Sequence, residues 1–132
     1  MHHVRLGFFE KFKGADAVLL SASAEEVRDL VQRLRLFAAS GNGELAIHPL
    51  AWVAPKHPVQ LYAVRSPEAS RRISRSRFDF LCSGPALGDI SSKLSTLAAS
   101  GSGHQYFTLL DSDAQLIVSM GEYDASFWQT DG

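Results

Sequence analysis

The sequence contains a single cysteine, Cys82, among its 132 residues, so an internal disulfide framework is excluded. A lone thiol in the apolar run 78–82 is typical of a small buried hydrophobe and suits a reducing compartment. No apolar run approaches the ~20 residues that a membrane helix requires. Charged residues also interrupt the apolar stretch 6–9 near the start, unlike a secretory signal. These absences favour a cytoplasmic protein without a membrane segment.

The chain also lacks a strong charge of either sign. Its formal net charge is −1, with 13 basic and 14 acidic residues, so the protein as a whole has no strong attraction for nucleic acid or anionic membranes. Hydrophobic residues make up 45% of the sequence, which is enough to build a core. The length and composition therefore predict one folded domain over residues 1–132.

Motifs that carry chemistry are missing as well. The sequence contains no Gly-x-Ser-x-Gly nucleophile elbow, no phosphate-binding loop with its lysine, and no His-x-His or His-x-x-x-His pair. Cys82 has no neighbouring histidine or basic residue to activate its thiol. We therefore expect no catalytic residue, no metal site and no cofactor, and a non-catalytic protein is favoured over an enzyme.

Two amphipathic helices are predicted, at about 23–40 and about 85–100. In each, apolar residues recur every three to four positions and collect on one face. The first helix begins with a capping box, in which Ser23 and Glu26 each accept a hydrogen bond from a free backbone N–H of the first turn. Pro85 suits the first turn of the second helix. Gly41 and Gly101 supply the flexible residues at which the helices end.

The two helices end alike. Residues 38–43 read Ala-Ala-Ser-Gly-Asn-Gly, and residues 98–103 read Ala-Ala-Ser-Gly-Ser-Gly. An apolar run ending in serine precedes each helix, and two strand-like runs follow each, at 44–50 and 59–64 and at 104–110 and 115–120. Both halves, at about 15–65 and 77–120, therefore read as βαββ.

This repeat predicts the fold class. We expect an α+β protein with one six- or seven-stranded, mainly antiparallel sheet and both helices on one face, built from a duplicated βαββ unit. An additional strand at residues 4–9 would extend one edge of the sheet.

The segment 65–77 joins the halves and contains no apolar period. Arginine side chains bind phosphate groups in a bidentate manner, so this connector is a candidate anion-binding surface, through Arg71, Arg72, Arg75 and Arg77. No aromatic residue lies among these arginines, which makes a solvated connector the alternative and nucleic-acid binding unlikely.

The tail, residues 121–132, is acidic and rich in aromatics, and we expect it to pack back onto the domain. Aromatic side chains beside charge are typical of binding hot spots. The tail is therefore a candidate partner-binding surface, through Glu122, Tyr123, Asp124, Phe127 and Trp128.

His104 begins a predicted strand and Glu122 follows the end of another, so the two side chains are expected to meet. The opening His-His-Val-Arg-Leu, residues 2–6, resembles the first strand of the vicinal-oxygen-chelate family. That resemblance implies a metal held between histidine and glutamate ligands. A small-ligand or metal-binding protein, or an enzyme, with a site between the halves is the alternative it supports.

The segment 116–124, which follows a polar hairpin, resembles the C-terminal strand of small bacterial immunity proteins, and the resemblance extends back to Gly103. It implies a bacterial protein that binds and neutralises a toxin domain. Our leading hypothesis is therefore a non-catalytic interaction module with one protein partner. A homodimer that pairs edge strands stays open as an alternative.

Overall fold

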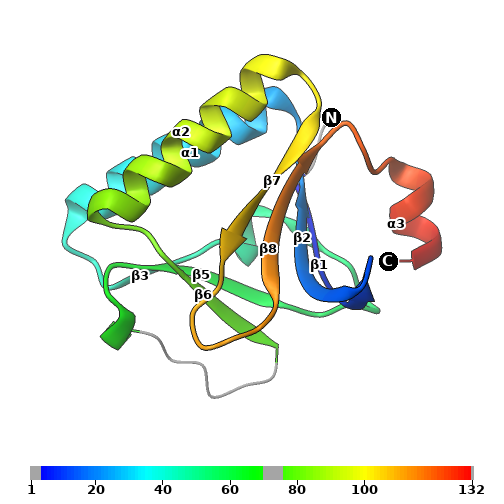
Figure 1. The fold of residues 1–132 in the computed structure, drawn as a ribbon, viewed down its shortest axis with the longest axis horizontal. Coiled ribbons are helices and arrows are strands. Elements are labelled where there is room, and N and C mark those ends of the chain that lie inside the picture. The colour runs from blue at the N-terminus through cyan, green and yellow to red at the C-terminus, as the bar shows by residue number, and fades with distance from the viewer. Residues whose placement is uncertain (1–3, 70–75, 132) are drawn as a thin grey trace.

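The computed structural model describes residues 4–69 and 76–131. Within these residues the fold is α+β, with three α-helices and two mixed sheets. Figure 1 shows the elements in space. They are β1 (Arg5–Phe12), β2 (Ala15–Ser21), α1 (Ala24–Ser40), β3 (Glu44–Ala46), β4 (Trp52–Val53), β5 (Gln60–Val64), β6 (Arg77–Leu81), α2 (Gly84–Ser100), β7 (Gly103–Thr108), β8 (Gln115–Met120) and α3 (Ala125–Asp131), with 3₁₀ turns at His48–Leu50 and Pro67–Ala69.

The two long helices begin and end where the sequence predicts. The capping box at the start of α1 is formed, because Ser23 N donates to Glu26 Oε1 at 2.9 Å and Glu26 N donates to Ser23 Oγ at 3.2 Å. Gly41 and Gly101 both have a φ of 85°, a left-handed conformation that favours glycine. A glycine in the same conformation therefore ends both helices, whereas the capping box starts α1 and Pro85 lies in the first turn of α2.

The expectation of one large antiparallel sheet is wrong. The strands form a five-stranded sheet in the order β4-β1-β2-β8-β7 and a three-stranded sheet in the order β3-β5-β6. Each sheet joins a hairpin from one half of the chain to a strand from the other, and the joints, β2–β8 and β5–β6, are parallel. The sheet divides because each long helix carries the chain from one sheet to the other.

The pairing pattern is the same in both sheets. Ser21 of β2 lies opposite Ser119 of β8, and Leu81 of β6 lies opposite Val64 of β5. Each residue of β6 has a number 60 higher than the corresponding residue of β2. Each residue of β5 has a number 55 lower than the corresponding residue of β8. The same two shifts relate the antiparallel pairs of β3 with β5 to those of β7 with β8. Strands β1 and β4 extend the five-stranded sheet beyond this shared pattern.

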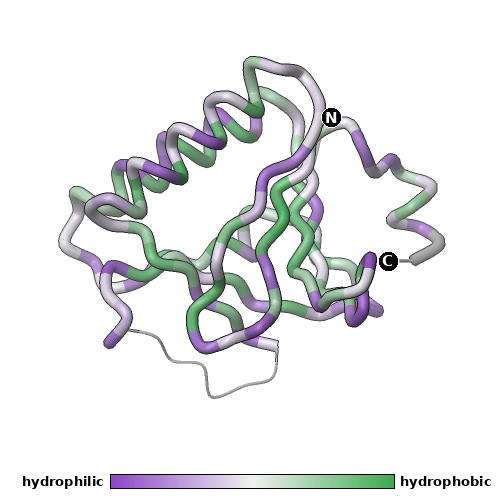
Figure 2. Tube along the Cα trace, in the orientation of Figure 1, coloured by the Kyte–Doolittle hydropathy of each residue, from purple (hydrophilic) through white to green (hydrophobic). Residues whose placement is uncertain are grey.

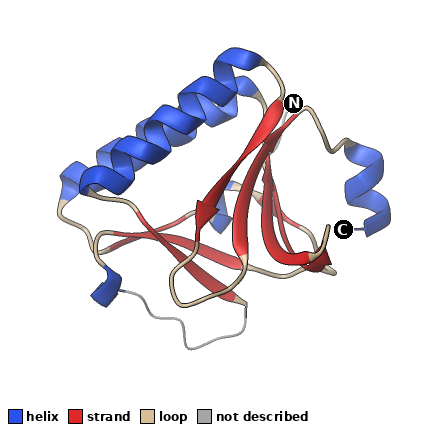
Figure 3. Ribbon diagram, in the orientation of Figure 1, coloured by secondary structure: helices blue, strands red, loops and turns tan. Residues whose placement is uncertain are grey.

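The main core lies between the helix pair and the two sheets. Helices α1 and α2 run side by side over it, and the strands supply its other walls (Figures 1 and 3). Figure 2 shows hydrophobic strand segments inside and alternating polar and apolar turns along both helices. Residues from both halves meet in this core, among them Leu20, Val31, Leu61, Phe80, Leu94 and Val118.

A smaller tail core lies on the opposite face of the five-stranded sheet, under α3. Side chains alternate along a strand, so Val18 and Leu20 enter the main core whereas Leu19 enters the tail core. The central strands are therefore apolar on both faces. The tail core consists of Phe9, Ala17, Leu19, Ala54, Ile117 and Trp128.

Candidate functional site

The C-terminal tail packs onto the domain, which changes the role of its aromatic residues. Trp128 is only 2% exposed and fills the tail core, so it is not an exposed contact residue as the sequence suggested. Tyr123 and Phe127 are half-buried against the same core. Glu122 and Asp124 stay exposed, and Asp124 Oδ1 accepts a hydrogen bond from Phe127 N at 3.1 Å. Of the five predicted contact residues, the charged pair is the most accessible.

Of the four connector arginines predicted to bind an anion, Arg77 lies among the described residues; Arg71, Arg72 and Arg75 lie outside them. Arg77 Nη2 lies 3.0 Å from Asp79 Oδ1 and 3.2 Å from Glu44 Oε1. Its guanidinium carbon lies 3.8 Å from the centre of the Tyr62 ring. An anion would have to displace two carboxylates from this group, so Arg77 serves the fold of the three-stranded sheet.

His104 and Glu122 meet as expected. His104 Nδ1 lies 3.0 Å from each carboxylate oxygen of Glu122, and Ser119 Oγ donates to Glu122 Oε1 at 2.6 Å. Burial alone would raise the pKa of Glu122, but hydrogen bonds from Ser119 and His104 and the charge of Lys13 hold that pKa below its usual value. The carboxylate lies between serine and histidine, an order that differs from a catalytic triad, in which the histidine contacts the hydroxyl. No group of three or more metal-ligating side chains forms among the described residues.

Other side chains with potential chemistry are used within the fold. His57 Nδ1 lies 3.0 Å from the carbonyl oxygen of Phe8, and the His57 ring stacks on Phe9. His48 Nδ1 accepts a hydrogen bond from Leu61 N at 3.2 Å. Cys82 is buried, and burial raises the pKa of its thiol to about 11. Both histidine Nδ1 atoms contact backbone groups, and the Cys82 thiol is buried.

A first groove of about 320 Å³ opens between the start of α1 and the main-core face of the five-stranded sheet. Its floor is apolar and its rim carries carboxylates on α1. Asp29 also forms an ion pair with Arg33, at 2.8 Å. The groove is lined by Val4, Leu20, Ala22, Glu25, Glu26, Asp29, Leu30, Arg33, Ile47 and Leu50.

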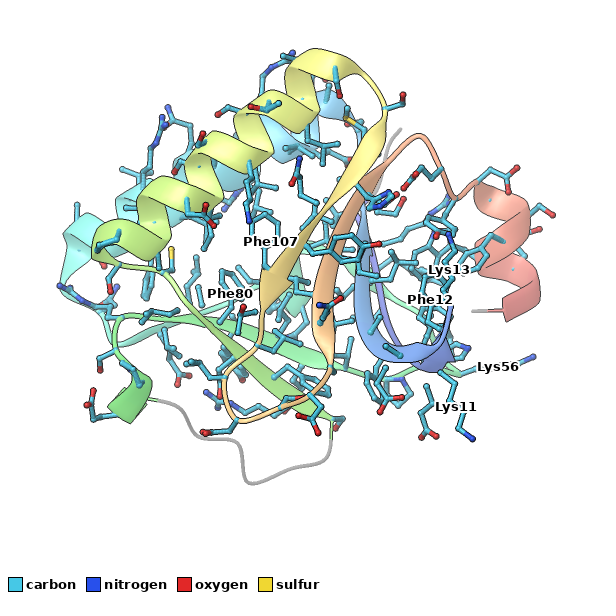
Figure 4. All side chains as sticks on the ribbon, in the orientation of Figure 1. Lys11, Phe12, Lys13, Lys56, Phe80 and Phe107 are labelled. Carbon is cyan, nitrogen blue, oxygen red and sulfur yellow. The ribbon has the colours of Figure 1, made fainter. Side chains whose placement is uncertain are left out.

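A second groove of about 260 Å³ opens between α2, β6 and β7. Phe80 and Phe107 project from two different strands toward the space beneath α2 (Figure 4). Lys93 Nζ lies 3.3 Å from Asp89 Oδ2 and 5.6 Å from the centre of the Phe107 ring. The lining is aromatic, and its one acid and one base balance in charge; its members are Phe80, Leu81, Ala86, Asp89, Ile90, Lys93, Tyr106, Phe107, Thr108 and Leu110.

The two grooves occupy corresponding places in the two halves. Seven residues of the first groove have a counterpart 60 positions later in the second, and both grooves keep an acid–base pair on the helix. The pairs are Leu20 with Phe80, Glu26 with Ala86, Asp29 with Asp89, Leu30 with Ile90, Arg33 with Lys93, Ile47 with Phe107 and Leu50 with Leu110. Sequence reasoning missed these grooves, although the 60-residue offset of the helix ends, extended upstream, aligns both ion pairs.

The edge of the five-stranded sheet exposes two large apolar side chains. Leu50 is 39% exposed at the first groove, and Trp52 of the edge strand β4 is 43% exposed. On the tail-core side of this edge, Trp52 borders a shallow third groove of about 220 Å³ together with Arg5 and α3. We call Leu50, Trp52 and the first and third grooves the edge surface. No pattern in the sequence indicated this surface, and Trp52 was assigned no role there.

The chain matches no protein-family model, no curated protein and no solved structure. No helix among the described residues is long and apolar enough to span a membrane. The geometry of the described residues is therefore the basis for a functional proposal.

Proposed function

We propose that the protein is a non-catalytic interaction module that binds a protein partner through the edge surface. The observation that carries this proposal is the exposure of Trp52 and Leu50 at a short edge strand, between two grooves. Tryptophan is enriched in binding hot spots, and an exposed apolar group that borders a groove gives a partner a place to bury its own side chains.

The polar clusters support a binding role over catalysis. The Ser119–Glu122–His104 cluster and the Arg77–Asp79 pair are satisfied by hydrogen bonds within the fold. A catalytic group needs an unsatisfied, accessible reactive atom beside an activating base. Among the described residues the two histidines His48 and His57 hold backbone groups instead.

The specific form of the proposal is a bacterial cytoplasmic immunity protein whose partner is a toxin domain. It is supported by the resemblance of residues 103–124 to the C-terminal part of small immunity proteins. In the structure these residues form β7, β8 and the loop to α3. The edge surface, on the far side of β1 and β2, is a different region, so the resemblance and the binding surface are independent supports.

The test compares partner capture by the native chain and by Trp52→Ala. We expect the affinity for the captured protein, identified by mass spectrometry from source cells, to fall about 30-fold or more, as for a hot-spot residue. The matched control is Leu36→Ala, because Leu36 is 71% exposed on α1 and lies outside the edge surface. Equal capture by the native chain and Trp52→Ala would refute the edge surface; equal loss in both variants would show a non-specific apolar effect.

We also propose that the chain arose by duplication of a βαββ unit. The constant shifts of 60 and 55 in strand pairing and the seven corresponding groove residues support this origin. Strands β1 and β4 would then be additions to the first half. Matched substitutions in the two halves test their equivalence, and they are described in the Discussion.

A further inference from the structure

The first groove combines an apolar floor with an excess of negative charge. Leu20 and Ile47 are almost fully buried at its base, and Leu30 is half-buried beside them. The rim carries three carboxylates, from Glu25, Glu26 and Asp29, against the single guanidinium of Arg33. Glu25 is exposed and forms no ion pair with another described residue. A ligand that complements this groove carries an apolar group for the floor and a positive charge for the rim.

The second groove shows that this negative charge is not required by the framework. Position 85 is proline and position 86 is alanine where the first helix has Glu25 and Glu26, and α2 nevertheless forms the same 17-residue helix. Glu26 has a local role in the capping box. The negative charge of Glu25 also stabilises the positive N-terminal end of the α1 dipole, a modest effect at an exposed position. The carboxylates therefore distinguish two grooves of otherwise corresponding construction.

We propose that the first groove binds a basic peptide segment of a partner protein, with an aliphatic side chain on the apolar floor and flanking arginines or lysines paired with Glu25 and Asp29. This inference rests on the proposed function, because it assigns a partner chemistry to one part of the edge surface. Charge complementarity selects this occupant: a nucleic acid or an acidic peptide would bring negative charge to the same rim. Leu50, exposed at the mouth, covers the aliphatic side chain once it is bound.

The probe is a fluorescein-labelled octapeptide, Ser-Arg-Arg-Ile-Ser-Arg-Ser-Arg, which places one aliphatic residue among arginines and has the sequence of residues 70–77. Fluorescence anisotropy measures its affinity for the full chain. We expect the double variant Glu25→Gln, Asp29→Asn to weaken binding about tenfold, and added salt to weaken binding to the native chain. Both side chains are exposed, so the variant is expected to fold normally.

Two matched controls separate the groove from general electrostatics. Asp89→Asn removes the corresponding carboxylate of the second groove and is expected to leave the affinity unchanged. A control peptide with serine in place of isoleucine is expected to bind about tenfold more weakly, since its apolar contact is lost. Equal binding of both peptides, or an equal loss in Asp89→Asn, would overturn the groove as the site.

Two further outcomes identify which proposal fails. If Glu25→Gln, Asp29→Asn keeps the partner whose capture depends on Trp52, the basic-segment inference is overturned while the proposed function stands. If neither this variant nor Trp52→Ala affects capture, the edge surface itself is refuted. Sedimentation of the chain alone tests a second copy as occupant: a concentration-dependent dimer abolished by the double variant would overturn a separate partner protein.

Discussion

The two grooves present the same framework with different chemistry. Asp29 and Arg33 border one, and Asp89 and Lys93 border the other, 60 positions later in each case. The first has an aliphatic floor and an acidic rim, whereas the second is aromatic and balanced in charge. The difference lies mainly in the first helical turn and in the side chains of the floor. The backbone thus fixes where a groove forms, and the side chains of the first helical turn and of the buried floor set its charge and lining.

The halves also differ at the strand that precedes each long helix. In the first half, β1 pairs with β2, and β2 is a central strand of its sheet. In the second half, β6 is the edge strand of the three-stranded sheet. Where β2 directs Leu19 into the tail core, the corresponding position of β6 is Asp79, a buried acid paired with Arg77. Among the described residues, the strand before the long helix therefore faces a second core in the first half and carries an ion pair at the corresponding position in the second.

The largest expected effect is the loss of corresponding leucines from the main core. Leu34 and Leu94 are 2% and 1% exposed, on the inner faces of α1 and α2. Replacing either with alanine should lower the free energy of unfolding by about 2–5 kcal/mol, because each substitution removes buried methyl groups and leaves a cavity. Urea unfolding of both variants measures the effect. If the halves are equivalent, the two losses of unfolding free energy should agree within about 1 kcal/mol. A substitution that is tolerated in one half alone would show that the halves are not equivalent.

A smaller effect is expected at the helix ends. Gly41 and Gly101 share a φ of 85°, and neither has a neighbouring atom closer than 3.8 Å to the position of an added Cβ. Each Gly→Ala substitution should therefore lower the free energy of unfolding by about 1 kcal/mol through backbone strain alone. Thermal unfolding of the two single variants compares them directly. A much larger loss of unfolding free energy at one glycine would show that its helix end contributes to stability in a way that the other does not.

The smallest effect concerns Glu122, whose interactions have no counterpart in the first half. The pKa of Glu122 is lower in the folded chain than its ordinary value of 4.5, so its contribution to stability is fully present above that pH and is lost as the pH falls through the folded pKa. The side chain is 33% exposed, so solvent screening limits the contribution to about 1 kcal/mol or less. The difference in unfolding free energy between the native chain and Glu122→Gln should shrink below pH 4.5; a difference that grows on acidification would contradict this sign.

The local part of the fold could be predicted from the sequence. Ser23 and Glu26 cap the start of α1, and Gly41 and Gly101 end α1 and α2, because capping depends on residues close in sequence. The polar turn Asp-Ser-Asp, residues 111–113, likewise predicts the hairpin that β7 and β8 form as an antiparallel pair. The meeting of His104 and Glu122 follows from that hairpin, since both residues lie near the same end of it.

The long-range part could not be predicted. No local signal near β2 or β6 indicates which strand each will pair with. Because β2 pairs with β8 and β6 pairs with β5, the expected single sheet is divided into two. The burial of Trp128 depends on a second apolar face formed by β1, β2 and β8, which are distant in sequence from the tail. The partner-binding and anion-binding roles first assigned to the tail and the connector, and the roles proposed for the edge surface, remain predictions.

The buried thiol of Cys82 allows transient opening of the native chain to be followed by chemical modification. The thiol is 0% exposed, its Sγ lies 4.0 Å from the carbonyl oxygen of Leu34, and its pKa is raised to about 11, so the folded state offers an alkylating reagent almost no thiolate. Modification at neutral pH must then wait for α1 to separate from the end of β6. Because the chain has one cysteine, every modified molecule records that single event. The rate of alkylation therefore reports how readily Cys82 becomes exposed under native conditions, by local or global opening, without denaturant or an introduced label.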